Sequence, residues 1–269
     1  MVNRGIARIL PAAVTGVLGC TYAGSVLADV EDTRVHPASP GDRRAADHDT
    51  KFTAGAELDL DSRFIWRGLA LSSGPILQPA AWASAYGLSA IVWTSILLTD
   101  EPPHRRVRSV VPSVAYTYSW DRFKIEPGVL FYWIGDELTP RSTAEAYLIG
   151  DVAFGKLHLV SENYFDVKDY PGAYFGSIGP QIELSHDPWT LKGTFDLGFA
   201  TADFNNAYFG VNGPALDVAE AGLEVRWDMT EHLYATIHGE GSVLLAPALW
   251  RAVNEPALGC IGTAFGAEL

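Results

Sequence analysis

The sequence predicts an all-β fold, a closed antiparallel transmembrane β-barrel of about 12 strands with short periplasmic turns and longer extracellular loops. Three observations lead to this prediction. Apolar and charged side chains alternate with a period of two residues along much of the chain. The links between these stretches alternate between short and long, as in bacterial outer-membrane barrels. No stretch of comparable length has helical spacing.

Composition and charge exclude several other classes of protein. The 269 residues include 19 basic and 32 acidic side chains, which give a net charge of −13. Because phosphate binding needs a basic face, we expect no nucleic acid partner. Hydrophobic residues make up 48% of the chain and charged residues 19%, which argues against disorder. The two cysteines, Cys20 and Cys260, provide neither a disulfide framework nor a cysteine-based zinc site.

The N-terminal segment has the features of an export signal. Arg4 and Arg8 precede an uncharged stretch, residues 9–28, that ends in small residues where a signal peptidase reads. We therefore expect residues 1–28 to be a signal peptide that is cleaved after Ala28. One alternative is lipoprotein processing at Cys20. Another is an uncleaved anchor, although proline and glycine residues interrupt the apolar run.

The remaining chain divides into two parts. Residues 29–50 carry many charges and almost no apolar side chains, so we expect a polar lead-in. Residues 51–269 carry the alternating pattern and form the predicted outer-membrane β-barrel. The twelve expected strands are 52–67, 76–86, 88–98, 107–119, 122–133, 143–153, 156–165, 173–185, 189–201, 215–227, 232–243 and 259–269.

The first expected strand shows the pattern over the longest stretch. Its apolar face runs from Phe52 through Leu58 to Phe64 and Trp66, while Asp59 and its charged neighbours lie on the other face. The strands over 122–133, 156–165 and 189–201 repeat this arrangement, and those over 76–86 and 88–98 show it least clearly. A strand with one apolar and one charged face fits a barrel wall between lipid and a polar lumen.

The links between strands indicate which end of the barrel faces which compartment. Short links near Gly87, Trp120, 154–155, 186–188 and 228–231 alternate with long links over 68–75, 99–106, 134–142, 166–172, 202–214 and 244–258. Short turns lie on the periplasmic side of outer-membrane barrels, and long loops lie outside. Trp120, Trp189 and Trp227 occur at short turns, where an interfacial aromatic girdle would lie. We therefore predict the outer membrane of a Gram-negative bacterium, with membrane lipid as a partner.

A soluble β-sandwich or small barrel is the alternative. An eight-stranded soluble barrel fills its interior with apolar side chains, but twelve strands enclose too wide a lumen for that. Four prolines complicate the membrane barrel, because they fall inside expected strands and remove hydrogen-bond donors. They are Pro79, Pro112, Pro127 and Pro180.

One stretch of the expected first hairpin resembles a known family. Residues 62–68, Ser-Arg-Phe-Ile-Trp-Arg-Gly, are followed by Ser-Ser-Gly-Pro at 72–75, Gln-Pro at 78–79 and Trp-Thr-Ser at 93–95. This arrangement resembles putative outer-membrane porins of the TorF type, and a weaker likeness continues through most of the chain. The resemblance implies an outer-membrane barrel. The sequence departs from the family at Ile96, where asparagine is frequent, and at Leu269, where an aromatic residue is usual.

Charged side chains at membrane depth must face the lumen, because lipid exposure is costly. They are the candidate pore-lining residues of a porin-like barrel for passive diffusion of small solutes or ions. Because acids outnumber bases, we expect a weak cation preference. The alternative is a set of salt bridges that brace a closed wall. The candidates are Glu57, Asp59, Asp61, Arg63, Arg67, Arg122, Lys124, Glu126, Glu145, Lys156, Glu162, Lys192, Asp196, Glu220, Glu224 and Arg226.

Other functions have weaker support in the sequence. A non-conducting scaffold could use the loops 202–214 and 244–258 as surfaces. A lipid hydrolase would need a serine and a histidine on one lipid-side face, but Ser185 and His186 are adjacent and point to opposite faces. His232 and His238 are too far apart on one strand to form a metal pair. We therefore expect no enzymatic activity, no cofactor and no metal site. The solute, the openness of the lumen and the oligomeric state stay undetermined by the sequence.

Overall fold

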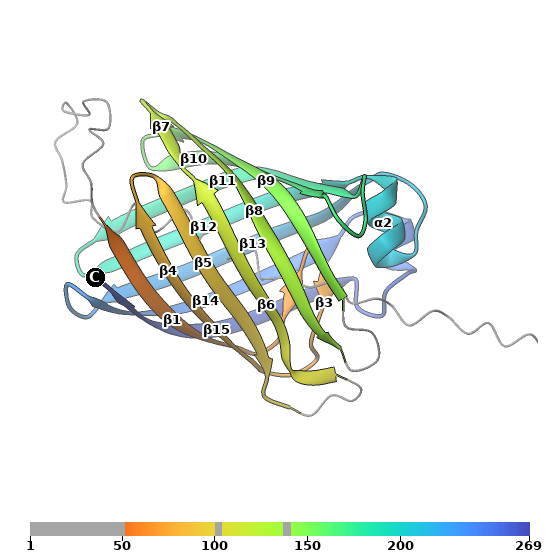
Figure 1. Cartoon of the computed structure of the whole chain (residues 1–269), viewed down its shortest axis with the longest axis horizontal. Helices are drawn as coiled ribbons and strands as arrows, with labels where there is room; N and C mark the ends of the chain where they lie inside the picture. Colours follow the sequence, from red (N-terminus) through yellow and green to blue (C-terminus); the bar gives the residue numbers. More distant parts are fainter. Residues whose placement is uncertain (1–51, 100–103, 137–140) are drawn as a thin grey trace, which may run out of the picture.

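The protein forms a closed antiparallel barrel in a computed structural model that describes residues 52–99, 104–136 and 141–269 (Figure 1). The predicted signal peptide, the polar lead-in and Lys51 lie outside the described residues. The wall strands are β1 (Thr53–Asp61), β4 (Ile76–Ala85), β5 (Leu88–Leu97), β6 (His104–Tyr116), β7 (Tyr118–Trp120), β8 (Phe123–Asp136), β9 (Arg141–Phe154), β10 (Leu157–Asp166), β11 (Tyr174–His186), β12 (Trp189–Ala200), β13 (Ala215–Asp228), β14 (Leu233–Leu244) and β15 (Ala257–Glu268).

The strands pair with their neighbours in sequence, and β15 pairs with β1 to close the ring. Both β6 and β7 pair with β8, and only Thr117 separates them, so they act as one wall strand. In the described part of the chain, the wall therefore has twelve strands, and the predicted fold is confirmed. The chain enters β1 and leaves β15 at the short-turn end, beside the position marked C in Figure 1.

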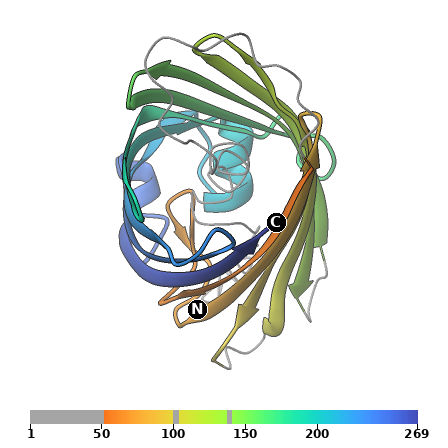
Figure 2. The same cartoon turned by 90° about the vertical axis from the view of Figure 1, so that its left-hand side faces the viewer.

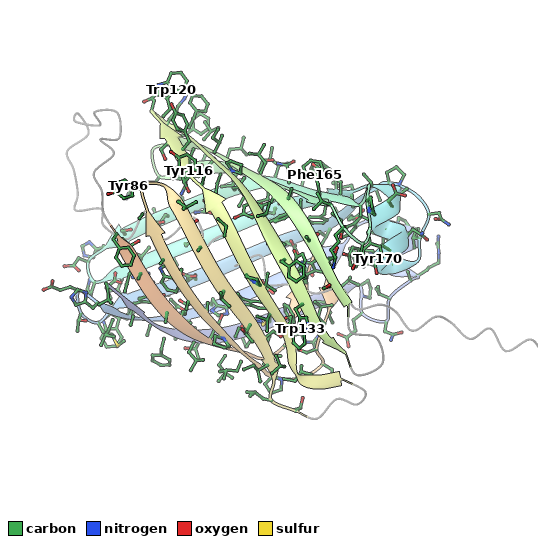
Figure 3. The ribbon with its side chains drawn as sticks, in the orientation of Figure 1. Tyr86, Tyr116, Trp120, Trp133, Phe165 and Tyr170 are labelled. Atoms are coloured by element: carbon green, nitrogen blue, oxygen red, sulfur yellow. The ribbon has the colours of Figure 1, made fainter. Side chains whose placement is uncertain are left out.

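Alternation along the strands separates an apolar exterior from a polar interior. On β1, Leu58 and Leu60 are 46% and 42% exposed, whereas Asp59 and Asp61 are 8% and 1% exposed. Large apolar side chains are exposed on every full-length wall strand except β4, and Figure 3 shows side chains projecting all around the wall. An exterior of this kind is stable only against lipid, because water contact with so much apolar surface would be unfavourable.

Aromatic side chains gather at the short-turn end, as the girdle prediction requires. Trp189 and Trp227 stack with ring centroids 5.7 Å apart, and Trp120 stacks on Phe123 at 6.1 Å. Tyr86 is exposed in the β4–β5 turn, where its φ of 55° and that of Gly87, 79°, form the left-handed pair of a two-residue hairpin. Figure 3 places Tyr86 and Trp120 at this end.

Each of the four strand prolines lies beside a local gap in one ladder. The β4–β5 ladder skips Gln78 and Pro79, the β11–β12 ladder skips Gly179 and Pro180, and the β6–β8 ladder skips Val111 and Pro112. Pro127 lies opposite the break between β6 and β7. Each proline stays paired to the strand on its other side. The missing donor therefore falls where the ladder is already interrupted.

The prediction of a first strand over 52–67 is wrong beyond Asp61, where β1 ends. There the chain leaves the wall and forms a small hairpin of β2 (Ile65–Trp66) and β3 (Leu69–Ala70), which lies inside the barrel outline in Figure 2. The expected loops 202–214 and 244–258 contain the helices α2 (Ala202–Phe209) and α3 (Pro247–Trp250). Figure 2 shows α2 within the ring of strands as well. Apolar side chains on these segments pack against other buried side chains. The alternation pattern does not predict this, because it describes only residues in the wall.

Candidate functional site

The lumen has two unlike walls. Residues 76–97, which include β4 and β5, contain no Asp, Glu, Lys or Arg. Their inward side chains are neutral, and Gln78, Trp82, Ser89 and Ile91 are buried. Among the side chains that the structure describes, the inward charged ones come from β1 and from the strands β8 through β15. The wall is therefore neutral on one side and charged on the other.

A pocket lies against the charged wall, lined from β8 through β14. It contains six acidic side chains and two basic ones, and the rest of its lining is neutral. Some of the acids have hydrogen-bonded partners: Glu162 accepts from Tyr164 Oη at 2.9 Å, and Glu126 accepts from Thr117 Oγ1 at 3.0 Å. The charged lining residues are Glu126, Asp151, Glu162, Asp196, Glu224, Glu240, Lys124 and Lys192.

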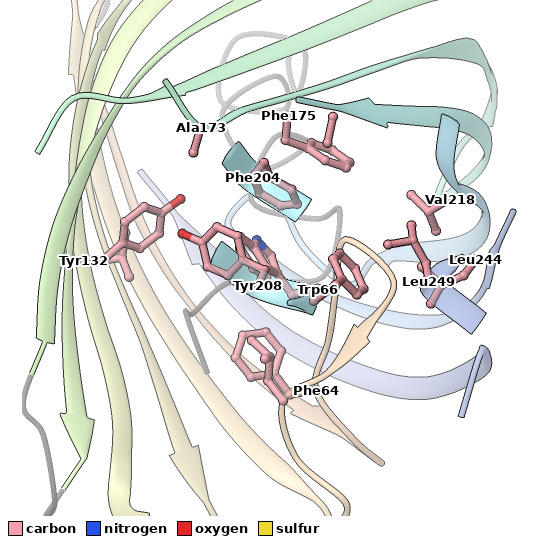
Figure 4. Close-up of a cluster of buried hydrophobic side chains, with 14 of the residues drawn as sticks. Phe64, Trp66, Tyr132, Ala173, Phe175, Phe204, Tyr208, Val218, Leu244 and Leu249 are labelled. Carbon is pink, nitrogen blue, oxygen red and sulfur yellow. The ribbon is translucent and has the colours of Figure 1, made fainter. Parts of the chain in front are cut away.

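An apolar cluster lies inside the long-loop end of the barrel. We call it the lumen cluster, and it joins the β2–β3 hairpin and α2 to side chains of the wall (Figure 4). Trp66 meets Tyr208 edge-on with ring centroids 5.1 Å apart, and Phe204 lies 4.6 Å from Tyr208. Its buried members are Phe64, Trp66, Leu71, Ile76, Leu97, Val111, Tyr132, Ala173, Phe175, Ala200, Phe204, Tyr208, Phe209, Val218, Leu244 and Leu249.

Arg67 lies at the tip of the hairpin and inside this cluster. Its guanidinium donates to both oxygens of Glu145 at 3.0 Å. The guanidinium carbon also lies 4.4 to 5.6 Å from the centroids of the rings of Trp66, Phe175, Phe204 and Tyr164. The aromatic faces and the carboxylate together compensate a charge that would be costly to bury alone.

Local conformation explains why an arginine can occupy this tip. Arg67 and Gly68 have φ values of 47° and 80°, the pair of left-handed residues that a two-residue turn needs. A side chain at position 68 would overlap Leu244, so glycine is required there for space as well. Burial lowers the pKa of Arg67, but Glu145, Tyr132 and Tyr164 together more than offset this effect and hold it above its ordinary value.

Helix α2 is anchored at both ends. Thr201 Oγ1 accepts from Phe204 N at the N-terminus, and Gly210 ends the helix with a φ of 68°. Asn205, fully buried, donates to Asp217 Oδ1 on β13 at 3.1 Å. Burial and then the charge of Glu145 raise the pKa of Tyr208. The helix therefore has a fixed position against the wall.

The structure distributes the sixteen predicted pore-lining residues over four locations. Arg67 lies in the lumen cluster, and Arg63 pairs with Glu255 at 2.8 Å beyond the end of β1. Arg122 and Lys156 are exposed in short turns and not on strands. The other twelve lie on wall strands and are buried or half-buried: Glu57, Asp59, Asp61, Lys124, Glu126, Glu145, Glu162, Lys192, Asp196, Glu220, Glu224 and Arg226. Whether they line a conducting pore stays a prediction.

Sequence reasoning missed the aromatic residues that surround Arg67. Phe64 and Trp66 were expected to face lipid, and Phe204 and Tyr208 lay in an expected loop. The one available signal was Arg67-Gly68 between short apolar pairs, because a residue pair of this kind can form a tight hairpin. His238 was considered only together with His232, and its contact with Asp61, on a strand far away in sequence, was not predicted.

These features define the protein as a transmembrane β-barrel of the outer-membrane type. The closed wall satisfies its backbone groups internally, and the exposed apolar belt makes a bilayer its environment. Barrels of this construction belong to the outer membrane, so the predicted location follows from the fold. Among the described helices, α2 and α3, neither has the length and apolarity to cross a bilayer.

Solved structures that align with this chain are outer-membrane barrels, and they include porins and channels as well as a phospholipase. The NanC porin aligns with a TM-score of 0.50 and 12% sequence identity, over 79% of this chain and 98% of its own. An outer-membrane channel from Pseudomonas putida F1, of the group COG4313, aligns with a TM-score of 0.47 and 9% identity, over 86% of this chain and 100% of its own. The KdgM porin, solved in complex with oligogalacturonate, aligns with a TM-score of 0.46 and 10% sequence identity. The alignment covers 80% of this chain and 97% of KdgM.

Sequence comparisons give no corresponding match. No family model matches the chain, and no curated protein does. The fold is therefore established by the structure and by its likeness to NanC, while the particular function is a matter for proposal.

Proposed function

We propose that this barrel is a porin-like channel for passive diffusion of small solutes or ions, with a weak preference for cations. The observation that supports it is the pocket against the charged wall, where six acids face two bases. An excess of acids gives a negative local potential that attracts cations and repels anions. In physiological salt this potential extends over about 8 Å, which is enough to act across part of a lumen of this kind.

The resemblance to TorF-type outer-membrane porins agrees with this proposal. The residues that carry the resemblance span the β2–β3 hairpin and the two strands after it. The partners are then membrane lipid outside and small solutes or ions inside. The neutral strands β4 and β5 leave the selectivity to the charged side chains of the other wall strands.

The test is single-channel recording of refolded protein in a planar bilayer under a salt gradient. We expect discrete conductance steps and a reversal potential on the cation-selective side. Anion selectivity would contradict the proposed preference while leaving a channel in place. Folded barrels without channel events would reject the channel itself.

A non-conducting scaffold is the second candidate, and the lumen cluster favours it. The hairpin and α2 fill part of the long-loop end with packed aromatic side chains. The same bilayer recording separates the two candidates, because a scaffold produces no conductance steps. A variant in which Phe204 and Tyr208 are both replaced by alanine then shows whether the cluster is what blocks the path.

A lipid hydrolase has the least support. Ser185 is exposed near a short turn, where its hydroxyl donates to Glu183 and accepts from Thr190. His238 faces inward and pairs with Asp61, away from the lipid. Neither residue forms a serine and histidine pair at the lipid side, and we favour a function without catalysis.

A further inference from the structure

Three side chains from two distant parts of the sequence meet inside the wall. Asp59 and Asp61 lie on β1, and His238 lies on β14, with β15 between these strands. His238 Nε2 is 2.8 Å from Asp61 Oδ1 and 3.8 Å from Asp59 Oδ2. One donor atom from each of the three side chains lies within 4.8 Å of the other two. All three side chains are buried.

Gly262 on β15 makes this meeting possible. It lies directly opposite Asp61 on one side and His238 on the other, so the three residues form one row across three strands. A Cβ atom at position 262 would overlap both Asp61 Oδ1 and His238 Nε2. The missing side chain therefore leaves the space in which a carboxylate and an imidazole reach toward each other across an intervening strand.

The charges of this group are not balanced by the protein. In the described part of the chain, His238 is the one basic side chain that pairs with Asp59 or Asp61. Each carboxylate also keeps one buried oxygen, Asp59 Oδ1 and Asp61 Oδ2, that has no hydrogen-bond partner. Two buried carboxylates with one histidine and unsatisfied oxygens are unfavourable unless a positive charge joins them.

We infer that Asp59, Asp61 and His238 bind a divalent transition-metal ion of the Zn²⁺ class. Ligand atoms bound to tetrahedral Zn²⁺ at about 2.0–2.2 Å lie roughly 3.3–3.6 Å apart, and the separations from His238 Nε2, 2.8 Å and 3.8 Å, lie on either side of that range. Imidazole nitrogen with carboxylate oxygen favours Zn²⁺ over Ca²⁺ or Mg²⁺, which prefer oxygen alone. Cys260 Sγ donates to Asp61 Oδ1 at 3.5 Å and is not part of the three-ligand group. Three protein ligands would leave the fourth position of a tetrahedral ion to water or another ligand.

The site lies at the root of the inward hairpin. Asp61 is the last residue of β1, and Cys260 Sγ donates to the backbone oxygen of Arg63 at 3.1 Å. A bound ion would therefore link β1 to β14 where the chain turns into the lumen. This inference does not depend on whether the barrel conducts.

The test is isothermal titration calorimetry, in which ZnCl₂ is added to the refolded barrel without an affinity tag. We expect one saturable site per chain, and an upward shift of the thermal unfolding midpoint with Zn²⁺, because an ion that binds only the folded state stabilises it. Co²⁺ in place of Zn²⁺ should give visible d–d absorption. His238→Ala and Asp59→Asn should each weaken binding at least about tenfold, since each removes a ligand. Gly262→Ala should weaken it as well.

His158→Ala is the matched control. His158 also pairs with a carboxylate facing the lumen, Asp151 at 2.9 Å, but it is not part of the three-ligand group found among the described residues. We expect this variant to bind Zn²⁺ like the unchanged protein. Heat modifiability on gels establishes that each variant is folded, and Asp59→Asn serves if His238→Ala fails to fold. The inference is overturned if the unchanged protein shows no saturable binding, or if folded His238→Ala and Asp59→Asn bind as tightly as it does.

Discussion

Arg67 and Glu145, 78 residues apart in sequence, form a bidentate ion pair in which the two side chains are 7% and 3% exposed. Tyr132 Oη donates to Glu145 Oε2 at 2.6 Å, so this oxygen accepts from both Arg67 and Tyr132. The pair connects the tip of the inward hairpin to β9 of the wall. It is the polar centre of an otherwise apolar cluster.

Removal of Arg67 should destabilise the barrel strongly. Arg67→Ala leaves Glu145 buried without its countercharge, which costs about 3–5 kcal/mol. Urea unfolding in detergent or lipid measures the loss. The matched control is Arg63→Ala, because Arg63 pairs with the exposed Glu255 and should cost about 0–1 kcal/mol. Equal losses for the two variants would contradict the anchoring role of Arg67.

The orientation of β12 can be tested with one pair of neighbours. Phe195 is 43% exposed on the outside, whereas Thr194 lines the inner pocket. Phe195→Arg should cost about 2–4 kcal/mol, because the charge faces lipid near the middle of the strand. Thr194→Arg places the same charge among acids and should cost much less. Refolding yields in lipid vesicles that rank the other way would show that the faces are reversed.

The pocket acids should set the ion preference. Neutralising Glu162 and Asp196 together, as Glu162→Gln with Asp196→Asn, reduces the negative potential of the pocket and should shift the reversal potential toward anions. Glu231→Gln is the control, because Glu231 is exposed in a short turn outside the lumen. A shift of the same size in the control would mean that surface charge, and not the pocket, determines selectivity.

Tight packing of tyrosine over glycine should make one wall position intolerant of alanine. Gly128 on β8 lies opposite Tyr147 on β9, and a Cβ atom there would overlap the tyrosine ring. Gly128→Ala should therefore cost about 1–3 kcal/mol through overpacking. Gly150→Ala on the neighbouring strand meets no atom within 4 Å and should be nearly neutral. Chemical unfolding of both variants measures the two losses of stability. Equal losses would contradict the prediction.

Much of the wall was predictable because lipid and lumen impose opposite requirements on alternate residues. The structure confirms this for Leu191 and Lys192, one exposed and the other buried, as their positions in the pattern indicate. The alternation of short and long links also indicated a ring of twelve strands. The links differ in length because outer-membrane barrels have short turns at the periplasmic end and longer loops at the other.

The interior was less predictable for a definite physical reason. Period two shows which residues share a face, but only while the chain stays in the wall. Phe64 and Trp66 continue the pattern past Asp61, although there the chain has turned inward. Trp66 packs against Phe204 and Tyr208 of α2, and Phe64 packs against Trp93 of β5. Asp61 and His238 could not be paired from sequence either, because their contact depends on closure of the ring between β1 and β15.

The pairing of β1 with β15 has a consequence for how the barrel must form. It joins Asp61 to Gly262, and the residues on the two strands are separated by about 200 positions (262 − 61 = 201). Such contacts come late in folding, because a long loop must be closed before they contribute stability. Until β15 is in place, both ends of the sheet have open edges that can pair with other chains. Insertion should therefore be a single cooperative step, and a chain that lacks β15 should aggregate instead of forming a smaller pore.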